Sequence, residues 1–373
     1  MNLDKNFDIP LTPIAGTKWI DPLTADVQFY GLNWIQEEHL YQRLSRRWEE
    51  AIGKVSPKVA ALSKHTAGGQ LHFITNSSCL VIHAKVHHMA GISGMTFVAQ
   101  GGFDCYVGED YDSLMFYDSS RFAVGMQEYE YTLFKDLKQE ERLVVINFPL
   151  YGGVEHIKIA IDEGAYIHKP LENFSSHYKI VYYGTSITQG GCASRPGLCY
   201  TNLLSRLMKA EIINLGFSGN AFGEDIVAQM IASIENTSMF VLDYEANGGT
   251  NGRLEATLEN MIQVIRRHHL DKPIVVISRI KYLFDDLKPD TLGKKREQIR
   301  LFQQRLVQRL SKKDHHIYYI NGSKLLGDDY HEYTVDSIHP NDLGFQKMAS
   351  HLEKEFKKIM KKEDEKKNES IIK

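Results

Sequence analysis

The first half of the chain alternates short apolar runs with turn residues. Runs of strand character recur between residues 69 and 161, with Gly, Asn and Asp between them. We expect strands at 71–75, 79–86, 95–99, 129–134, 143–148 and 154–161. In the second of these, Leu80, Ile82 and Ala84 occupy every other position, which is the period of a half-buried strand. Several short strands without a long helical pattern predict a β-sandwich or jelly roll.

Residues 37–52, ahead of these strands, are ambiguous. Their sequence, EEHLYQRLSRRWEEAI, fits a short amphipathic helix, which we favour, or a loop with a strand edge. Residues 164–177 form a connector that contains Pro and Ser, and after it the pattern changes from strands alone to strands alternating with helices.

The second half alternates strands with helices. Residues 178–183 (YKIVYY) form a continuous apolar run, typical of a parallel strand covered on both faces. Further strands are expected at 211–215, 239–243, 273–278 and 317–320, and helices at 198–209, 223–234, 253–268, 294–310 and 343–360. This order predicts an α/β fold: a mostly parallel sheet in a three-layer α/β/α domain, with ligands at the carboxyl ends of its strands.

This change in the pattern of predicted elements predicts two domains. We place a β-sandwich domain at residues 1–165 and the α/β domain at 178–362. Residues 363–373 mix both charges, and we expect a frayed, solvated tail there.

Composition narrows the functional classes. The 373 residues include 47 acidic and 44 basic ones, a formal net charge of −3, which argues against a nucleic-acid partner. No run reaches the ~18–20 apolar residues of a membrane span. The first residues lack the pattern of a signal peptide, so we expect a cytoplasmic protein with free thiols. A homo-oligomer remains open.

Four short blocks follow predicted strands and contain candidate chemistry. In GTSITQG, Ser186 lies on a tight strand-to-helix turn, which can expose a nucleophilic hydroxyl. In DSIHPND, Asp336 precedes His339 by three residues, so a carboxylate can orient the imidazole. The glycine-rich NLGFSGN can bring backbone N–H groups close to a ligand, and EANGG contributes the amide of Asn247. Alone, the serine turn and the histidine beside proline are more typical of a structural role, the turn asparagine is uninformative, and the glycine-rich loop fits an ordinary turn as well as a site.

Together, the four blocks resemble in order the signature blocks of the SGNH (GDSL-like) hydrolase superfamily, over residues 178–360. The resemblance implies that Ser186 is the nucleophile, His339 the general base and Asp336 its orienting acid. It implies an oxyanion hole made of the N–H groups of Ser186 and Gly219 and the amide of Asn247, with Gly216 the less favoured second donor. The sequence departs from the family pattern at Thr185, where the GDS form has Asp, and at Gly248, where Asp is usual.

A sub-group of this superfamily has an N-terminal β-domain with a Gly-x-Asp-Leu-Tyr motif, which residues 102–106 (GFDCY) resemble. Asp104 and Tyr106 either form a structural turn, which we favour, or line the substrate crevice. Arg195, in the loop after the nucleophile, contacts substrate or, as we prefer, is a solvated loop residue. We expect no cofactor and no metal, because adjacent histidines such as His268 and His269 diverge and chelate poorly.

These features predict a serine esterase that removes a short acyl group, most plausibly acetyl, through an acyl-enzyme. The resemblance favours a carbohydrate ester, so the expected partner is a small-molecule or oligosaccharide ester, with no membrane or nucleic acid. One alternative is an acyltransferase with the same triad. Another is a carbohydrate-binding protein with an inactive hydrolase domain.

Overall fold

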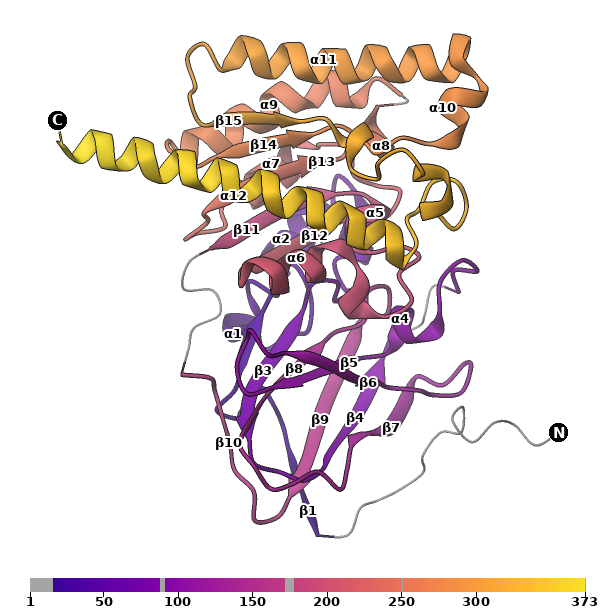
Figure 1. The fold of residues 1–373 in the computed structure, drawn as a ribbon, viewed down its shortest axis with the longest axis vertical. Helices are drawn as coiled ribbons and strands as arrows, with labels where there is room; N and C mark the ends of the chain where they lie inside the picture. The colour runs from indigo at the N-terminus through magenta and orange to yellow at the C-terminus, as the bar shows by residue number, and fades with distance from the viewer. Residues whose placement is uncertain (1–15, 88–90, 172–177, 250, 373) are drawn as a thin grey trace. The chain divides into compact units, whose positions relative to one another are not determined.

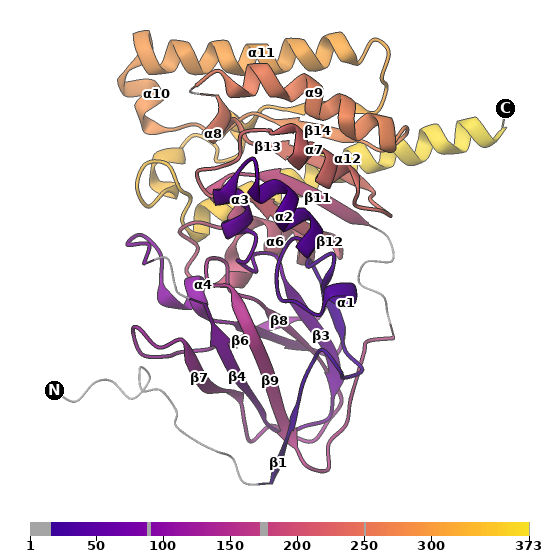
Figure 2. The ribbon, with the colours of Figure 1, turned by 180° about the vertical axis from the view of Figure 1, so that it is seen from behind.

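The protein divides into two compact units, which the ribbons trace (Figures 1 and 2). The computed structural model describes residues 16–87, 91–171, 178–249 and 251–372. The N-terminal unit contains described residues 16–46, 63–87, 91–171 and 194–197. The hydrolase-like unit contains described residues 47–62, 178–193, 198–249 and 251–372. Of the expected connector, residues 172–177 lie outside the described residues, and 167–168 form a short strand.

The N-terminal unit consists of two antiparallel sheets. One has the strand order β1-β9-β4-β7, and the other has the order β10-β3-β8-β5-β6, with β2 paired to β3. The first sheet comprises β1 (Thr17–Ile20), β4 (Leu80–Val86), β7 (Glu128–Phe134) and β9 (Val154–Asp162). The second comprises β2 (Gln28–Tyr30), β3 (Gln70–Thr75), β5 (Asp104–Gly108), β6 (Met115–Ser119), β8 (Arg142–Asn147) and β10 (Ile167–His168).

One apolar core joins these two sheets. Ile82 and Ala84 of β4 are fully buried in the same cluster as Phe73 of β3 and Ile146 of β8. His83, between the first two, has 21% of its side chain exposed. The alternation expected for this strand is therefore confirmed, and the unit is a β-sandwich.

Two predictions for this half need correction. Residues 95–99 do not form a strand: α4 (Phe97–Gly101) begins after Thr96, whose side-chain oxygen accepts the N–H of Ala99 at 3.0 Å. This capping bond overrides the β-propensity of the segment. Residues 37–52 form two helices rather than one, α1 (Ile35–Glu38) and α2 (Arg46–Gly53), and α3 (Pro57–Leu62) follows.

A five-stranded sheet with the order β12-β11-β13-β14-β15 forms the centre of the hydrolase-like unit, and every pair in it is parallel. Its strands are β11 (Lys179–Gly184), β12 (Glu211–Gly216), β13 (Met239–Asp243), β14 (Ile274–Ile277) and β15 (Ile317–Ile320). Its helices are α5 (Ser186–Gln189), α6 (Tyr200–Met208), α7 (Asp225–Ala232), α8 (Glu245–Gly248), α9 (Arg253–His268), α10 (Leu283–Leu287), α11 (Lys294–Leu310) and α12 (Asp342–Ile372).

The longer helices of this unit form two layers. Helix α6 packs against α12, whereas α7 packs against α9, and α9 also contacts α11. Helices α6 and α12 lie in front of the sheet in Figure 1, and α7 and α9 lie in front of it in Figure 2. The predicted three-layer arrangement is therefore confirmed.

The last helix is longer than expected. Instead of fraying at residue 363, α12 continues to Ile372. Glu363 is buried, and its carboxylate is bonded to the ring of His316, to the Tyr318 hydroxyl and to the Lys366 ammonium. These partners anchor the segment, which its mixed charge alone did not reveal.

Sheet register brings three of the sequence blocks together. Gly184, at the end of the central strand β11, pairs with Gly216 of β12 on one side and with Asp243 of β13 on the other. The chain leaves all three strands at the same level, at their carboxyl ends. This edge is where ligands bind in open parallel sheets.

Candidate active site

Ser186 is presented by a sharp turn between β11 and α5. Thr185 is the N-cap residue of α5, and its Oγ1 accepts the N–H of Ile187 at 3.4 Å. Gly184 has no room for a side chain, because a Cβ there would lie 2.0 Å from Thr188 Oγ1. The threonine that replaces the family's aspartate thus has a local role as a helix cap.

Three side chains form a hydrogen-bonded chain in this unit. Ser186 Oγ lies 2.8 Å from Nε2 of His339. Nδ1 of His339 lies 2.7 Å from Oδ2 of Asp336, so its N–H donates to the carboxylate and leaves Nε2 to accept the serine proton. This is the geometry that general-base activation of a serine requires.

A tight turn directs two backbone N–H groups at the Asp336 carboxylate. Ser337 adopts a left-handed φ of 67°, and Asp336 Oδ1 accepts the backbone N–H groups of Ile338 at 3.0 Å and His339 at 2.7 Å. Partial burial acts to raise the pKa of Asp336, but the hydrogen bonds from His339 and Ile338 outweigh it and hold that pKa below its ordinary value. The carboxylate therefore stays ionised beside the imidazole.

Two candidate oxyanion donors, the Gly219 N–H and the Asn247 NH₂, have no hydrogen-bond acceptor among the described residues. Gly219 has a left-handed φ of 68°, and within the described part of the chain its N–H donates to no acceptor. Oδ1 of Asn247 accepts the N–H of Ala221 at 3.2 Å, which orients the amide and leaves its NH₂ group without an acceptor among the described residues. Both groups can donate to a substrate oxygen.

Gly216 is placed differently from Gly219. Its N–H donates to Oδ1 of Asn214 at 2.9 Å, and a Cβ at this position would lie 2.3 Å from the backbone N of Gln189. The glycine lets β12 approach α5 closely. Gly216 thus has a packing role, which supports the preference for Gly219.

Sequence reasoning missed a buried acid at the end of β13. The Tyr200 hydroxyl lies 3.1 Å from Oδ2 of Asp243 and 3.0 Å from Oγ1 of Thr188 in helix α5. Burial raises the pKa of Asp243 to about 7. The sequence feature that could have revealed this buried acid is an aspartate at the end of an otherwise apolar strand, MFVLD.

A second missed feature holds α8, the helix that contains Asn247. Glu245 is buried, and its carboxylate accepts Nη1 of Arg296 at 2.7 Å, Nε2 of Gln303 at 2.6 Å and the N–H of Arg279 at 2.9 Å. Arg296 and Gln303 both belong to α11. These bonds fix the backbone from which Asn247 projects.

The remaining candidates, Arg195, Asp104 and Tyr106, bind one another in the N-terminal unit. Nη1 of Arg195 lies 2.7 Å from both Asp104 Oδ2 and the Tyr106 hydroxyl, and the Gly197 N–H donates to the same Asp104 oxygen at 2.7 Å. Oδ1 of Asp104 accepts the Asn147 amide at 2.7 Å. Arg195 is only 16% exposed at its side chain, so the expected solvated loop arginine is wrong.

Comparison with known proteins follows this division of the chain. Residues 177–357 match the GDSL-like Lipase/Acylhydrolase family, and residues 17–167 match the N-terminus of Esterase_SGNH_hydro-type, known as GxDLY. The protein belongs to the GDSL-like lipase/acylhydrolase (SGNH) family. More closely, it belongs to the type with an N-terminal GxDLY domain.

Solved structures share the fold over most of the chain. A GDSL-like lipase from Bacteroides ovatus has a TM-score of 0.83 and 29% identity, over 92% of this chain and 98% of that one. The salicylyl-acyltransferase SsfX3 from a tetracycline biosynthetic pathway has a TM-score of 0.72 and 19% identity, over 90% and 96%. A family two carbohydrate esterase from Clostridium thermocellum, in complex with cellohexaose, has a TM-score of 0.57 and 13% identity, over 78% and 92%.

Two negative findings concern curated relatives and membrane-spanning helices. No curated protein matches the chain significantly. Among the residues that the structure describes, none of the helices has the length and apolar character needed to cross a bilayer.

Proposed function

We propose that the protein is a serine esterase that hydrolyses short-chain esters, acetyl esters above all, of a carbohydrate or another small hydroxylated compound. The observation that carries this proposal is the hydrogen-bonded chain from Ser186 through His339 to Asp336. Membership of an acylhydrolase family supports ester chemistry at this site.

The reaction takes two steps. His339 Nε2 accepts the proton of Ser186 as Oγ attacks the ester carbonyl, and the imidazolium is stabilised by Asp336. The N–H groups of Ser186 and Gly219 and the amide of Asn247 donate to the oxyanion, and the alcohol leaves with the proton from His339. Water, activated by the same histidine, then releases the acid and restores Ser186.

Two observations bear on the class of substrate. The carbohydrate esterase from Clostridium thermocellum was solved with cellohexaose, and it shares its fold with this chain. A net charge of −3 gives no electrostatic reason to expect a polyanionic substrate. A neutral acetylated sugar agrees with both observations.

Acyl transfer is the second candidate. The similarity to the salicylyl-acyltransferase extends over 90% of this chain, and the same triad would serve if an alcohol instead of water resolved the acyl-enzyme. The two reactions differ only in the acceptor, so product analysis separates them.

The test is release of nitrophenol from nitrophenyl acetate, butyrate and octanoate by the wild type and by Ser186→Ala. We expect the acetyl ester to react fastest and Ser186→Ala to fall to the background rate. Ser311→Ala, at a half-buried serine whose hydroxyl donates to the backbone oxygen of Gln308, should retain wild-type activity. Equal activity of wild type and Ser186→Ala would refute the nucleophile. Inactivity of the wild type on these esters and on acetylated oligosaccharides would favour a binding protein.

The acceptor is then identified by mass spectrometry of products formed with an oligosaccharide alcohol in excess. Free acetate as the main product supports hydrolysis. An acetylated oligosaccharide as the main product supports acyl transfer.

A further inference from the structure

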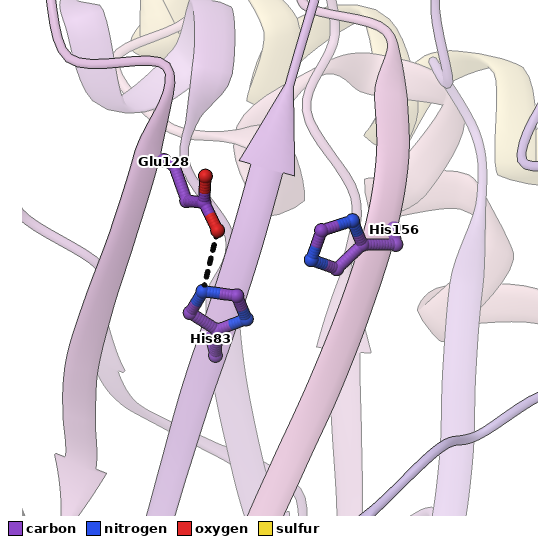
Figure 3. Close-up of side chains that lie close together, drawn as sticks. All are labelled: His83, Glu128 and His156. Atoms are coloured by element: carbon purple, nitrogen blue, oxygen red, sulfur yellow. Dashed lines mark hydrogen bonds and ion pairs between the residues drawn. The ribbon is translucent and has the colours of Figure 1, made fainter.

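Three side chains that commonly bind metals meet on one face of the sheet β1-β9-β4-β7 in the N-terminal unit (Figure 3). His83 comes from β4, Glu128 from β7 and His156 from β9. Nε2 of His83 lies 3.1 Å from Oε1 of Glu128, and the His83 and His156 ring centroids are 5.3 Å apart. One ligand atom from each residue lies within 4.8 Å of the other two.

The register of the three strands produces this cluster. Lys85 of β4 pairs with Glu128 on one side and with His156 on the other. His83 is two residues from Lys85, so Glu128 and His156 are its diagonal neighbours on the same face. The intervening residues of the strands, Ala84 and Ile157 among them, are buried in the core, which prevents a slip of one residue.

The donor set suits a divalent transition metal. Two imidazole nitrogens and one carboxylate oxygen are ligands of Zn²⁺, which takes three protein ligands and a water at open sites. Tetrahedral Zn²⁺ at ~2.0–2.2 Å from each ligand requires ligand atoms roughly 3.3–3.5 Å apart. The ligand atoms are no more than 4.8 Å apart, so bringing them into this geometry takes at most about 1.3–1.5 Å, which rotation of side chains on a fixed sheet can supply. The Glu128 side chain is 54% exposed, which leaves solvent access for the remaining position.

The surrounding charges favour a cation. Lys158 and Glu130 lie directly across from His83 on either side and carry opposite charges. The Lys85 ammonium is bound by Glu155 at 2.8 Å. The same ammonium also interacts with Glu128, so two carboxylates share one lysine, and Glu128 lies next to two imidazoles that can donate lone pairs to a metal.

A simple ion pair between His83 and Glu128 accounts for less of the arrangement. Such a pair needs two residues, and at an exposed position it contributes little to stability. It gives no reason for a second imidazole at the same point on the next strand. A shared ligand accounts for all three residues.

We propose that His83, Glu128 and His156 form a binding site for a divalent transition metal ion, Zn²⁺ being the probe that fits the donors best. The ion joins β7, β4 and β9 and stabilises the folded N-terminal unit, because it binds the native register and not the unfolded chain. The site goes beyond the proposed esterase activity and takes no part in it.

The test uses the full chain, with any histidine tag removed and metals stripped by a chelator. Calorimetric titration with ZnCl₂ is expected to show one site. His83→Ala and His156→Ala should each weaken binding by more than the roughly 10- to 100-fold that loss of an outer-shell partner costs. His168→Ala, at a histidine of β10 in the same unit, is the matched control and should bind as the wild type does.

A competing cluster must be separated from this one. Cys192, Asp336 and His339 also have ligand atoms within 4.8 Å of one another. Both nitrogens of His339 already contact Ser186 and Asp336, so this cluster is the weaker candidate. Cys192→Ser should leave zinc binding intact, and the Co²⁺-loaded protein should lack a thiolate charge-transfer band.

Stability gives an independent readout. Zinc should raise the Tm of the wild type and of Cys192→Ser but not that of His83→Ala, while His83→Ala keeps the esterase rate of the metal-free wild type. The proposal is overturned if zinc does not bind, if His83→Ala and His156→Ala bind it unchanged, or if Cys192→Ser abolishes binding.

Discussion

The carboxylate of Asp336 holds both the ring and the backbone of His339. Its Oδ2 lies 2.7 Å from the ring Nδ1, and its Oδ1 accepts the backbone N–H of the same residue at 2.7 Å. Two bonds from one carboxylate to one histidine fix the position and the tautomer of the imidazole together. The orientation of His339, the proposed general base, is thus set within a loop of four residues.

The first prediction concerns this pair. In Asp336→Asn, the amide oxygen can still accept the backbone N–H, so the loop should keep its shape. The amide NH₂ then faces Nδ1 and favours the tautomer with the proton on Nε2, which cannot accept the serine proton. We expect kcat on nitrophenyl acetate to fall by roughly 10³- to 10⁴-fold with little change in Tm. A loss below tenfold would contradict the assignment.

The second prediction concerns Asn247, the proposed oxyanion donor on α8. Asn247→Ala removes an amide whose NH₂ has no acceptor among the described residues, and loss of one such donor costs roughly 10²- to 10³-fold in rate. The loss should appear in kcat and not in KM. Asn260→Ala, which removes a surface bond to Asp225, provides the comparison and should leave kcat unchanged.

The third prediction concerns the buried charges behind Asn247. Glu245→Ala leaves two buried guanidinium groups, those of Arg296 and Arg279, to share the single carboxylate of Asp285, which should lower the free energy of unfolding by about 3–5 kcal/mol. Urea denaturation measures the loss. Glu259→Ala breaks the exposed pair with Arg309 and should cost less than about 1 kcal/mol. Equal costs for the two variants would show that the buried network is not stabilising.

The fourth prediction is a pH dependence of stability. Burial raises the pKa of Asp243 from 3.8 to about 7, so the folded protein holds this proton at pH values where the unfolded chain has lost it. The contribution of Asp243 is most favourable below pH 4, declines as the pH rises from about 4 to 7, and is constant above 7.

Asp243→Asn removes this titration. The free energy of unfolding of the variant relative to the wild type should therefore improve between pH 4 and pH 8, by a few kcal/mol at most. Urea denaturation at several pH values measures the difference. A constant difference across this range would mean that Asp243 does not keep its proton on folding.

Much of the hydrolase-like unit could be predicted because its signals are local. The apolar run before Gly184 indicated the central strand, and the helix expected at 253–268 matches α9. The blocks around Ser186 and His339 each keep their residues within one turn. Their placement at strand ends follows from the topology of parallel sheets, which leaves few alternatives.

The rest depends on contacts between distant segments. The Glu245–Arg296 pair joins residues 51 positions apart, and its partners carry no local motif. The strand expected at residues 95–99 is a helix because of a cap at Thr96 that composition does not reveal. The cluster at His83 exists only once the order β9-β4-β7 and its register are known.

The short segment 194–197 matters for how this protein can be divided. It belongs to the N-terminal unit, although residues on both sides of it, Ala193 and Leu198, belong to the hydrolase-like unit. Conversely, residues 47–62 belong to the hydrolase-like unit, although the residues on both sides of them belong to the N-terminal unit. A gene fragment that starts after the connector would lack helices α2 and α3, and the other fragment would lack Arg195 and Gly197, two donors to the buried Asp104. A chimaera made by joining two proteins at a single point in the sequence would therefore separate residues from their own unit. A chimaera that folds must keep residues 47–62 with the hydrolase-like unit and residues 194–197 with the N-terminal unit.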